Sequence, residues 1–470
     1  MSQELTFGVI VGNRGVFPSH LILDGREKML NVLHSNGIKS VALDTEHTKN
    51  GGVSTLDEAI ACSDLFKKHR QEIDGILVTL PNFGDEKSVS DAIRYSGLNV
   101  PVLVHAFDDD KSKMTAANRR DSFCGKLSLC NNLNQYGIPF SLTKFHTIDP
   151  SDEAFAEDLN NFSMVCRVFK GLRNIRVGVL GARPTNFNTV RFSEKLLERH
   201  SITVDTLDLS EAFGRTQVIK SDDPELNAKI EEIRSYAVID NVPDEALIRM
   251  AKLGVVVDRW MVSNHLTLTA IQCWTAMEKY YGITPCTLMS ILSDKLLPSA
   301  CETDVMGVLS MYALTLASQQ PSSILDWNNN YGTDRLKTVL FHCSNLPASF
   351  FEERPEIVYS EIFAGDVGQE NAYGTMSGRI KPEPFTYCRL SSDELAGKIS
   401  VYLGEGIFTN DELSTFGGYG VAEVPRLQEL MRYICLNSFE HHVATNLAKV
   451  ADPLEEVFTR YFNWNVYRHS

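Results

Sequence analysis

The sequence predicts an α/β protein in which two domains built on parallel sheets precede a β-rich C-terminal domain. Short apolar runs alternate with helical patterns from residue 5 onward, and the same alternation restarts at residue 175. After Pro355 the alternation gives way to short β-like runs and to stretches that contain Gly and Pro. We therefore expect three domains, formed by residues 1–172, 173–354 and 355–470.

Length and composition agree with this division and limit the possible partners. At roughly 150 residues per domain, 470 residues correspond to about three domains. The formal net charge is -15 and the sequence has no Lys/Arg run, which argues against a nucleic-acid or anionic-membrane partner. A neutral small molecule or a metal ion is easier to accommodate.

Cysteine usage and the first residues predict the cellular compartment. The ten cysteines contain no CxxC pair, so neither a zinc ribbon nor a disulfide framework is indicated. The chain does not open with a basic segment followed by an apolar core, and no apolar stretch approaches about 18 residues. We expect a cytoplasmic protein with reduced thiols and no membrane partner.

The first domain is predicted from buried-strand patterns and from the loops that follow them. Asn13, Arg14 and the turn at residues 80–82 come after such strands, where ligands bind in parallel sheets. Neither GxGxxG nor GxxxxGK[ST] is present, so no dinucleotide or phosphate fingerprint is indicated. The expected strands are residues 5–12, 40–43, 75–79 and 101–105, and the expected helices are 24–36 and 55–72.

The second and third domains are predicted in the same way. Gln272 is polar among apolar neighbours and needs a hydrogen-bond partner. For the second domain we expect strands at 175–181, 203–207, 254–258 and 336–341 and helices at 189–199, 223–237, 266–281 and 305–318, the last with Glu302 and Asp304 in its first turn. For the third domain we expect β-like runs at 385–389 and 399–403 and a helix at 424–436.

Residues 301–343 contain two carboxylates and a histidine at turn-like boundaries of apolar segments, namely Glu302, Asp326 and His342. Taken singly, each has an ordinary explanation. Glu302 could be an acid at a helix start, Asp326 a turn residue and His342 a core histidine, and the later His441 and His442 could lie on the surface. Taken together, carboxylates with imidazole provide the ligands that Mn²⁺ or Mg²⁺ prefers.

The motifs in this region resemble a known family. Gln272-Cys273-Trp274, Cys301-Glu302-Thr303-Asp304, Leu325-Asp326-Trp327-Asn328-Asn329 and Phe341-His342-Cys343-Ser344-Asn345 are similar to the core of the L-fucose isomerase and L-arabinose isomerase superfamily. The resemblance covers most of the chain in order. It is most specific between residues 265 and 350 and weakens after 355, and Ser344 stands where the family commonly has glycine.

The resemblance implies an aldose–ketose isomerase with two Rossmann-like domains, each a doubly wound parallel sheet, and a β-barrel-like C-terminal domain. It implies that Glu302 and Asp326 bind Mn²⁺, or another divalent cation such as Co²⁺ or Mg²⁺, and act as the acid/base pair of a cis-enediol mechanism. His442, in preference to His441, would complete the site, and His342 matches a ligand of the arabinose branch.

The resemblance also implies how substrate is bound and how subunits assemble. Gln272, Trp274 and Asn345 lie in the matching motifs and are candidate substrate-binding residues. Family members form trimers or hexamers in which a neighbouring first domain closes each active site. A homo-oligomer is therefore expected, with Arg14 or its loop in the pocket of another subunit.

The identity of the sugar is left open by the sequence. A neutral deoxyhexose or pentose, L-fucose-like, is the default that the resemblance implies. Arg14, Arg183, Arg379 and Lys381 are cations expected on loops, and their convergence on the sugar would favour an anionic hexose such as a sulfonated, sulfoquinovose-like sugar. Each could equally be a solvated surface charge.

Two further functions compete with isomerisation. A non-catalytic sugar-binding protein could reuse the same scaffold, since fold does not fix function, but it predicts a broken metal set and the sequence shows an intact one. A metal-dependent aldolase would also need carboxylate and histidine ligands. It would release a three-carbon fragment, whereas an isomerase leaves the carbon number unchanged.

Overall fold

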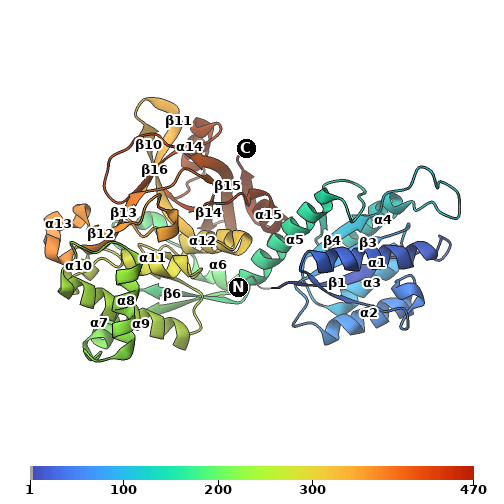
Figure 1. Ribbon diagram of the computed structural model, residues 1–470, viewed down its shortest axis with the longest axis horizontal. Helices are drawn as coiled ribbons and strands as arrows, with labels where there is room; N and C mark the ends of the chain where they lie inside the picture. The colour runs from blue at the N-terminus through green and yellow to red at the C-terminus, as the bar shows by residue number, and fades with distance from the viewer. Residues whose placement is uncertain (1–3) are drawn as a thin grey trace. The chain divides into compact units, whose positions relative to one another are not determined.

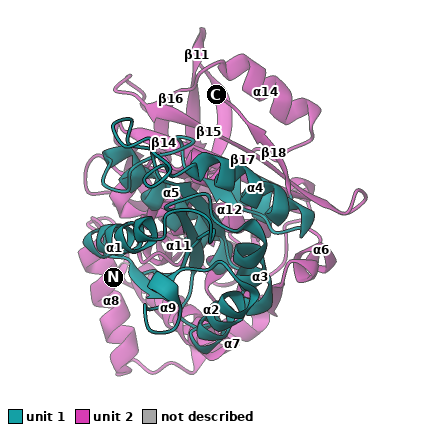
Figure 2. Ribbon diagram, turned by 90° about the vertical axis from the view of Figure 1, so that its right-hand side faces the viewer, with its two compact units in different colours: residues 1–170, 456–463 teal, residues 171–455, 464–470 magenta. Residues whose placement is uncertain are grey.

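The computed structural model describes residues 4–470, which divide into two compact units. Unit 1 comprises the described residues up to 170 together with 456–463, and unit 2 comprises 171–455 together with 464–470. Figure 1 labels the elements along the chain, and Figure 2 shows the two units in different colours. Within residues 4–470, no helix combines the length and the apolar character that crossing a membrane would require.

Unit 1 is built on a five-stranded parallel sheet with the order β2-β1-β3-β4-β5. Every residue of β1, β3 and β4 is buried, as expected for strands covered on both faces. Its elements are β1 Thr6–Val11, α1 His20–Ser35, β2 Lys39–Ala42, α2 Leu56–Lys68, β3 Gly75–Leu80, α3 Glu86–Ser96, β4 Val102–Ala106, α4 Ser122–Gln135, β5 Ser141–Leu142 and α5 Glu153–Gly171.

Local sequence signals explain where these helices begin and end. Thr55 and Glu58 form a capping box that satisfies free N–H groups at the start of α2. Gly97 adopts a left-handed conformation with φ 60° directly after α3, which glycine does without steric cost. The predicted alternation of strand and helix in this part of the chain is confirmed.

Unit 2 contains a four-stranded parallel sheet with the order β7-β6-β8-β9. The second predicted parallel sheet is therefore confirmed. Its strands are β6 Ile175–Leu180, β7 Ile202–Leu207, β8 Leu268–Ile271 and β9 Ser299–Ala300, and the helices that accompany it are α6 Glu194–Arg199, α7 Leu209–Gln217, α8 Pro224–Tyr236, α9 Asp244–Ser263, α10 Ala276–Tyr280, α11 Cys286–Asp294 and α12 Val305–Ser318.

Two predicted elements of this region were wrong. Residues 254–258, expected as a strand, lie inside α9, where burial of most of the helix gives a continuous apolar run that cannot be told from a strand. Residues 266–281, expected as one helix, form strand β8, a turn and the short helix α10. The three-to-four spacing of their apolar residues therefore comes from separate elements.

A nine-stranded mixed sheet forms the rest of unit 2, in the order β12-β13-β16-β11-β10-β17-β14-β15-β18. An additional pairing joins β15 to β16, so strand pairing runs in a closed circuit through β16, β11, β10, β17, β14 and β15. Its elements are β10 Ser322–Tyr331, β11 Asp334–His342, β12 Glu356–Tyr359, α13 Glu361–Val367, β13 Tyr373–Arg379, β14 Pro384–Asp393, β15 Lys398–Phe408, β16 Gly418–Glu423, α14 Leu427–Leu436, β17 His442–Asn446, α15 Ala451–Glu456 and β18 Asn465–Arg468.

Helix α12 connects the two sheets of unit 2 and is buried along almost its whole length. It packs against β8 of the parallel sheet and against β10, β14 and β17 of the mixed sheet. Asp304 caps its first turn by accepting a hydrogen bond from the Gly307 amide at 2.9 Å. The start of α12 thus lies where strand ends from both sheets meet, and the candidate site is built there.

Candidate metal centre and active site

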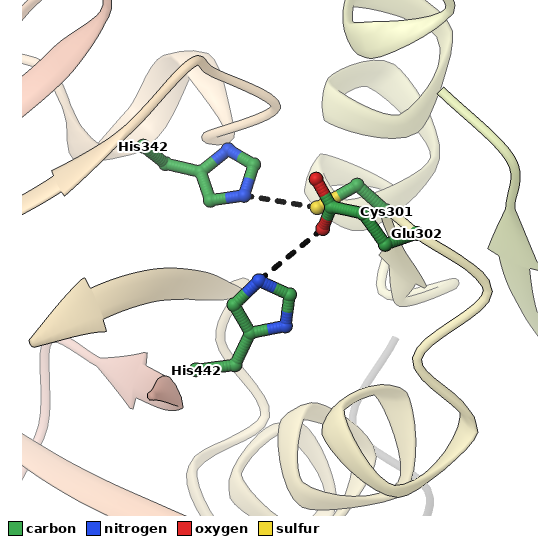
Figure 3. A group of neighbouring side chains, drawn as sticks. All are labelled: Cys301, Glu302, His342 and His442. Carbon is green, nitrogen blue, oxygen red and sulfur yellow. Dashed lines mark hydrogen bonds and ion pairs between the residues drawn. The ribbon is translucent and has the colours of Figure 1, made fainter. Parts of the chain in front are cut away.

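Four separate segments of unit 2 bring acidic, histidine and cysteine side chains together. Cys301 and Glu302 follow β9, Asp326 lies in β10, His342 ends β11 and His442 begins β17. Figure 3 shows the two histidines pointing from their strands toward Cys301 and Glu302. The ligand atoms of Cys301, Glu302, His342 and His442 all lie within 4.8 Å of one another.

Sheet pairing places Asp326 beside His442. The antiparallel register of β10 and β17 makes these two residues direct partners, and the Asp326 Oδ1 atom lies 3.5 Å from His442 Nε2. Asp326 is therefore a strand residue, and its expected position in a turn was wrong. The Asp-Trp-Asn-Asn sequence continues β10 instead of ending it.

Glu302 is held by an unusual backbone and by hydrogen bonds that Trp274 and Cys273 donate to its Oε1 atom. It lies in the turn between β9 and α12 with φ 51°, and not in the first turn of the helix as predicted. A left-handed non-glycine residue costs of order 1–3 kcal/mol, and the neighbouring Thr303, with φ 55°, adopts the same conformation. The Trp274 indole N–H donates to Glu302 Oε1 at 2.9 Å, which leaves Oε2 facing His442 Nε2 at 3.2 Å.

The geometry of Glu302, Asp326 and His442 fits a hard divalent ion. Glu302 Oε2 and Asp326 Oδ1 are both buried, and among the described residues their polar contacts are with the histidine rings: both oxygens face His442, and Asp326 also faces His441. Buried carboxylate oxygens without partners are costly unless a cation compensates them. Their separations of 3.2 and 3.5 Å from His442 Nε2 are close to the edge of about 3 Å in an octahedron with bonds of about 2.1 Å.

The other two histidines are held differently. His441 Nε2 lies 3.6 Å from Asp326 Oδ1 on a side chain that is 42% exposed, so it can supply a ligand only from the solvent side. The His342 Nε2 atom lies 2.9 Å from the Cys301 sulfur, and its Nδ1 atom lies 3.6 Å from the Cys343 sulfur. His342 thus belongs to the cysteine side of the cluster.

A buried ionic network orients His442. Its Nδ1 atom lies 2.8 Å from Asp304 Oδ2, which places a proton on Nδ1 and directs Nε2 toward Glu302 and Asp326. Arg389 donates to both oxygens of Asp304, at 2.5 and 3.1 Å, and to Glu440 Oε2 at 3.1 Å. Ser391 also donates to Glu440. Arg389 and Asp304 are fully buried, so the network holds His442 away from solvent.

The same contacts set the protonation of the cluster. Burial alone would raise the pKa of Glu302, but the contact with His442 outweighs it and holds this pKa well below its usual range. Burial alone would lower the pKa of His442, but Asp304 and Glu302 raise it. For His342, the Cys343 thiol and the nearby carboxylates overcome burial and raise the pKa to about 9. The Glu302 carboxylate is therefore ionised at neutral pH and suited to a cation.

Replacing Asp304 with Asn should weaken the binding of the metal ion by about 10–100-fold. The Asp304 carboxylate holds the His442 ring and increases its basicity, and an amide cannot provide the same negative charge. Isothermal titration of the metal-free protein with Mn²⁺ measures the change. Asp158→Asn, at a buried aspartate of unit 1, is the control. Unchanged Mn²⁺ affinity in a folded Asp304→Asn protein would contradict the positioning role.

Three predicted substrate residues lie around this cluster. Besides its bond to Glu302, Trp274 packs edge-to-face on the ring of Phe187. Gln272 finds the partner that its sequence context required, because its Oε1 accepts from the Ala182 amide at 2.8 Å. Asn345 is buried and donates to the Ser299 carbonyl at 3.3 Å. Gln272 and Asn345 therefore support neighbouring backbone, and their contact with substrate stays a prediction.

The predicted arginines have different local partners. Arg14 lies in unit 1, where it pairs with Glu86 and stacks on Phe83 at 4.3 Å. Arg379 donates to the carbonyls of Thr409 and Asp411 at 3.0 and 2.9 Å. Arg183 lies in unit 2 on the loop after β6 and lines a cavity, described next. Of the three arginines, Arg183 alone borders the cavity that Glu440 also lines.

The loop between β6 and α6 lies against the cluster and borders a cavity of about 790 Å³. Phe187 on this loop contacts the ring of His441 at 5.8 Å and that of His442 at 6.4 Å. The cavity is lined by Arg183 and Arg191 from the loop and by Glu440, which directly precedes the histidine pair. The lining of this cavity stops at Glu440 and does not include His441 or His442.

Comparison with known proteins agrees with the arrangement of the chain. Residues 8–173 match the family model of the fucose/sulfoquinovose isomerase N-terminal domain, and residues 340–470 match that of the L-fucose isomerase C-terminal domain. Together the two matches cover more than half of the 470 residues. The chain belongs to the fucose isomerase superfamily. The resemblance drawn from the motifs is confirmed, and this is a family of metal-dependent aldose–ketose isomerases.

Two curated relatives within this superfamily are sulfoquinovose isomerases. The protein of Priestia aryabhattai is 24% identical over 292 residues, which are 62% of this chain and 63% of the relative. The protein of Alkalicoccus urumqiensis is 24% identical over 397 residues, which are 83% of this chain and 85% of the relative.

In this fucose isomerase-like chain, the sequence patterns did not predict the buried ionic network that orients His442. Asp304 was interpreted only as an acid at a helix start, a role that it does have as N-cap of α12. Arg389 stands between Cys388 and Leu390 in the buried part of β14, and Glu440 directly precedes the histidine pair. A charge in each of these positions was a signal that a buried partner exists.

A second buried carboxyl, Glu278 on α10, lies outside this network. Its side chain is fully buried, and within the described residues neither of its oxygens has a hydrogen-bond partner. Burial raises the pKa of Glu278 from 4.5 to about 8. Between these two pH values the folded protein keeps a proton that the unfolded chain releases, so the free energy of unfolding falls as pH rises.

Glu278→Gln should remove this loss and make the protein more stable than wild type at pH 9, by about 3 kcal/mol, with little difference at pH 5. Urea denaturation at both pH values measures the effect. Glu353→Gln, at an exposed position, serves as control. If the free energies of unfolding of wild type and Glu278→Gln changed in parallel between the two pH values, Glu278 would be ionised in the folded protein.

Proposed function

We propose that this chain is a metal-dependent aldose–ketose isomerase whose substrate is a sulfonated aldohexose, sulfoquinovose-like. The observation that carries the reaction is the pair of buried carboxylate oxygens, Glu302 Oε2 and Asp326 Oδ1, that face one imidazole nitrogen of His442. The observation that favours a sulfonated sugar over the neutral deoxyhexose is the similarity to sulfoquinovose isomerases.

Glu302, Asp326 and His442 would hold the metal ion, for which Mn²⁺ is our first choice. When bound, such an ion supplies a Lewis acid that stabilises negative charge on O1 and O2 of an open-chain sugar. His441, near Asp326 on the exposed side, is available as a further ligand. Asp304 and Arg389 fix the orientation of His442, so its Nε2 atom does not need to reorganise when the ion enters.

Glu302 and Asp326 would each carry out one of the two proton transfers. One takes the proton from C2 of the aldose and returns it to C1, and the other moves the hydroxyl proton from O2 to O1. The product is a ketose of the same carbon number. Trp274 fixes the first oxygen of Glu302, so the second oxygen is directed toward the space in front of His442.

The cavity beside the histidine pair provides a place for the rest of the sugar. Arg183 and Arg191 are its cations, and a guanidinium binds an oxyanion through two parallel hydrogen bonds. We propose that Arg183 binds the sulfonate. The expected sharing of the site between subunits, through Arg14, stays part of this proposal.

A panel of aldoses tests the function. Metal-free protein is reloaded with Mn²⁺ and incubated in D₂O with a sulfonated aldohexose, with L-fucose or with L-arabinose, and products are followed by NMR. We expect the sulfonated ketose with solvent deuterium at C1, and conversion of the neutral sugars at least tenfold more slowly.

Each contrary outcome overturns a definite part of the proposal. Faster conversion of L-fucose or L-arabinose would overturn the sulfonated substrate. A three-carbon product would indicate an aldolase. Binding of sugars without conversion would overturn catalysis and favour a sugar-binding protein.

A further inference from the structure

Cys301 and His342 form a second pair of potential metal ligands within the cluster. The Cys301 sulfur and His342 Nε2 lie 2.9 Å apart, and both side chains are buried (Figure 3). A thiol and an imidazole are the ligands that Zn²⁺ and related thiophilic ions prefer, whereas Mn²⁺ and Mg²⁺ prefer carboxylates. The pair therefore differs in chemistry from the carboxylates that face His442.

Two more ligand atoms complete a set of four around this pair. Glu302 and His442 have ligand atoms within 4.8 Å of both Cys301 and His342. Glu302 is 4% exposed, and within the described residues its Oε2 atom has no hydrogen-bond partner. In a tetrahedral zinc site, sulfur and nitrogen ligands lie about 3.5 Å apart, so a slight opening of the Cys301–His342 pair suffices.

The two sets of ligands overlap but are not identical. Asp326 groups with His441 and His442, and it is not part of the set that contains Cys301 and His342. His442 belongs to both sets. Because one imidazole nitrogen cannot bind two ions, an ion on the cysteine side excludes an ion on the Asp326 side.

We propose that this cluster also binds a thiophilic divalent ion, Zn²⁺ or Cd²⁺, through Cys301, His342, Glu302 and His442. The Cys301 thiol loses its proton to solvent as the sulfur–metal bond forms, and no electron transfer is involved. A hard ion bound at Asp326 and a thiophilic ion bound at Cys301 compete for the same ligand, His442. The inference rests on the proposed function only in sharing Glu302 and His442, and it makes thiophilic ions inhibitors of the hard-ion form.

Ultraviolet titration of the metal-free protein with Cd²⁺ tests the thiolate ligand directly. We expect a sulfur-to-metal charge-transfer band that saturates at one Cd²⁺ per chain. Cys301→Ser and His342→Gln should each lower the Cd²⁺ affinity at least tenfold, and Cys301→Ser should also remove the band. Cys286→Ser, a matched control at another buried cysteine, should retain the band.

Asp326→Asn separates the two ions. It should lose Mn²⁺ affinity and keep the Cd²⁺ band, because Asp326 is not in the thiophilic set. In wild type, one equivalent of Zn²⁺ should release bound Mn²⁺, seen as a rise in the electron paramagnetic resonance signal of free Mn²⁺. The absence of a band, a full band in Cys301→Ser, or simultaneous binding of both ions would overturn the proposal. None of these measurements uses a sugar, so failure of the proposed isomerase activity shows separately in the sugar assay.

Discussion

Glu302→Gln should lower kcat for isomerisation by about 10³-fold or more, even with Mn²⁺ at saturation. An amide has no basic oxygen to accept the C2 proton, and the carboxylate charge that faces His442 is lost. Gln has nearly the same shape as Glu and can still accept the Trp274 hydrogen bond. Initial rates at several Mn²⁺ concentrations separate a loss of ion binding from a loss of proton transfer.

The chain offers a matched control for this substitution. Glu278→Gln makes the same chemical change at another fully buried glutamate, which has no assigned part in proton transfer. It should keep kcat within about twofold. Near wild-type turnover by metal-loaded Glu302→Gln would remove Glu302 from the acid/base pair, and an equal loss in both variants would point to a general effect on folding.

Arg389→Met should lower the free energy of unfolding by about 3–5 kcal/mol. Arg389 is fully buried and is the cation between Asp304 and Glu440, so its removal leaves the buried Glu440 without its charge partner and Asp304 with His442 alone. Methionine fills a similar volume, so the loss reports chiefly the charge. Urea denaturation of the metal-free protein measures the difference without a contribution from ion binding.

Arg259→Met is the control for Arg389→Met. Arg259 also pairs with two acids, Asp223 and Glu225, but its side chain is 47% exposed and solvent can replace those contacts. A loss below about 1 kcal/mol is expected there. If both variants lost the same free energy of unfolding, burial of the Arg389 network would add nothing to the stability that it provides.

Much of the fold could be predicted because parallel strands are buried on both faces. The run at 175–181 is apolar apart from Arg176, and a helical pattern follows it, so strand β6 and the parallel character of its sheet were predicted from local sequence alone. The same rule failed at 254–258, since a helix that is buried on most sides presents the same apolar run. Periodicity distinguishes the two structures only where one face meets solvent.

The candidate site could be predicted in its members but not in its contacts. Carboxylates with histidines indicated a metal, and the motifs around Glu302 and Asp326 indicated the family, which the comparisons confirm. The pairing of Asp326 with His442 depends on two strands far apart in sequence, so no local pattern contains it. The ionic contacts of Asp304 likewise follow from the position of α12 against β14, which only the folded chain defines.

The register between β10 and β17 has a consequence for how insertions and deletions affect this chain. Successive side chains of a strand face opposite sides, so a single-residue insertion next to His442 would present His441 or Val443 to Asp326. Such a change would keep the sheet while exchanging the candidate ligand. A two-residue insertion would restore the face but shift the ring by about 7 Å along the strand. Length changes are therefore tolerated in the turns at the ends of these strands and not within them.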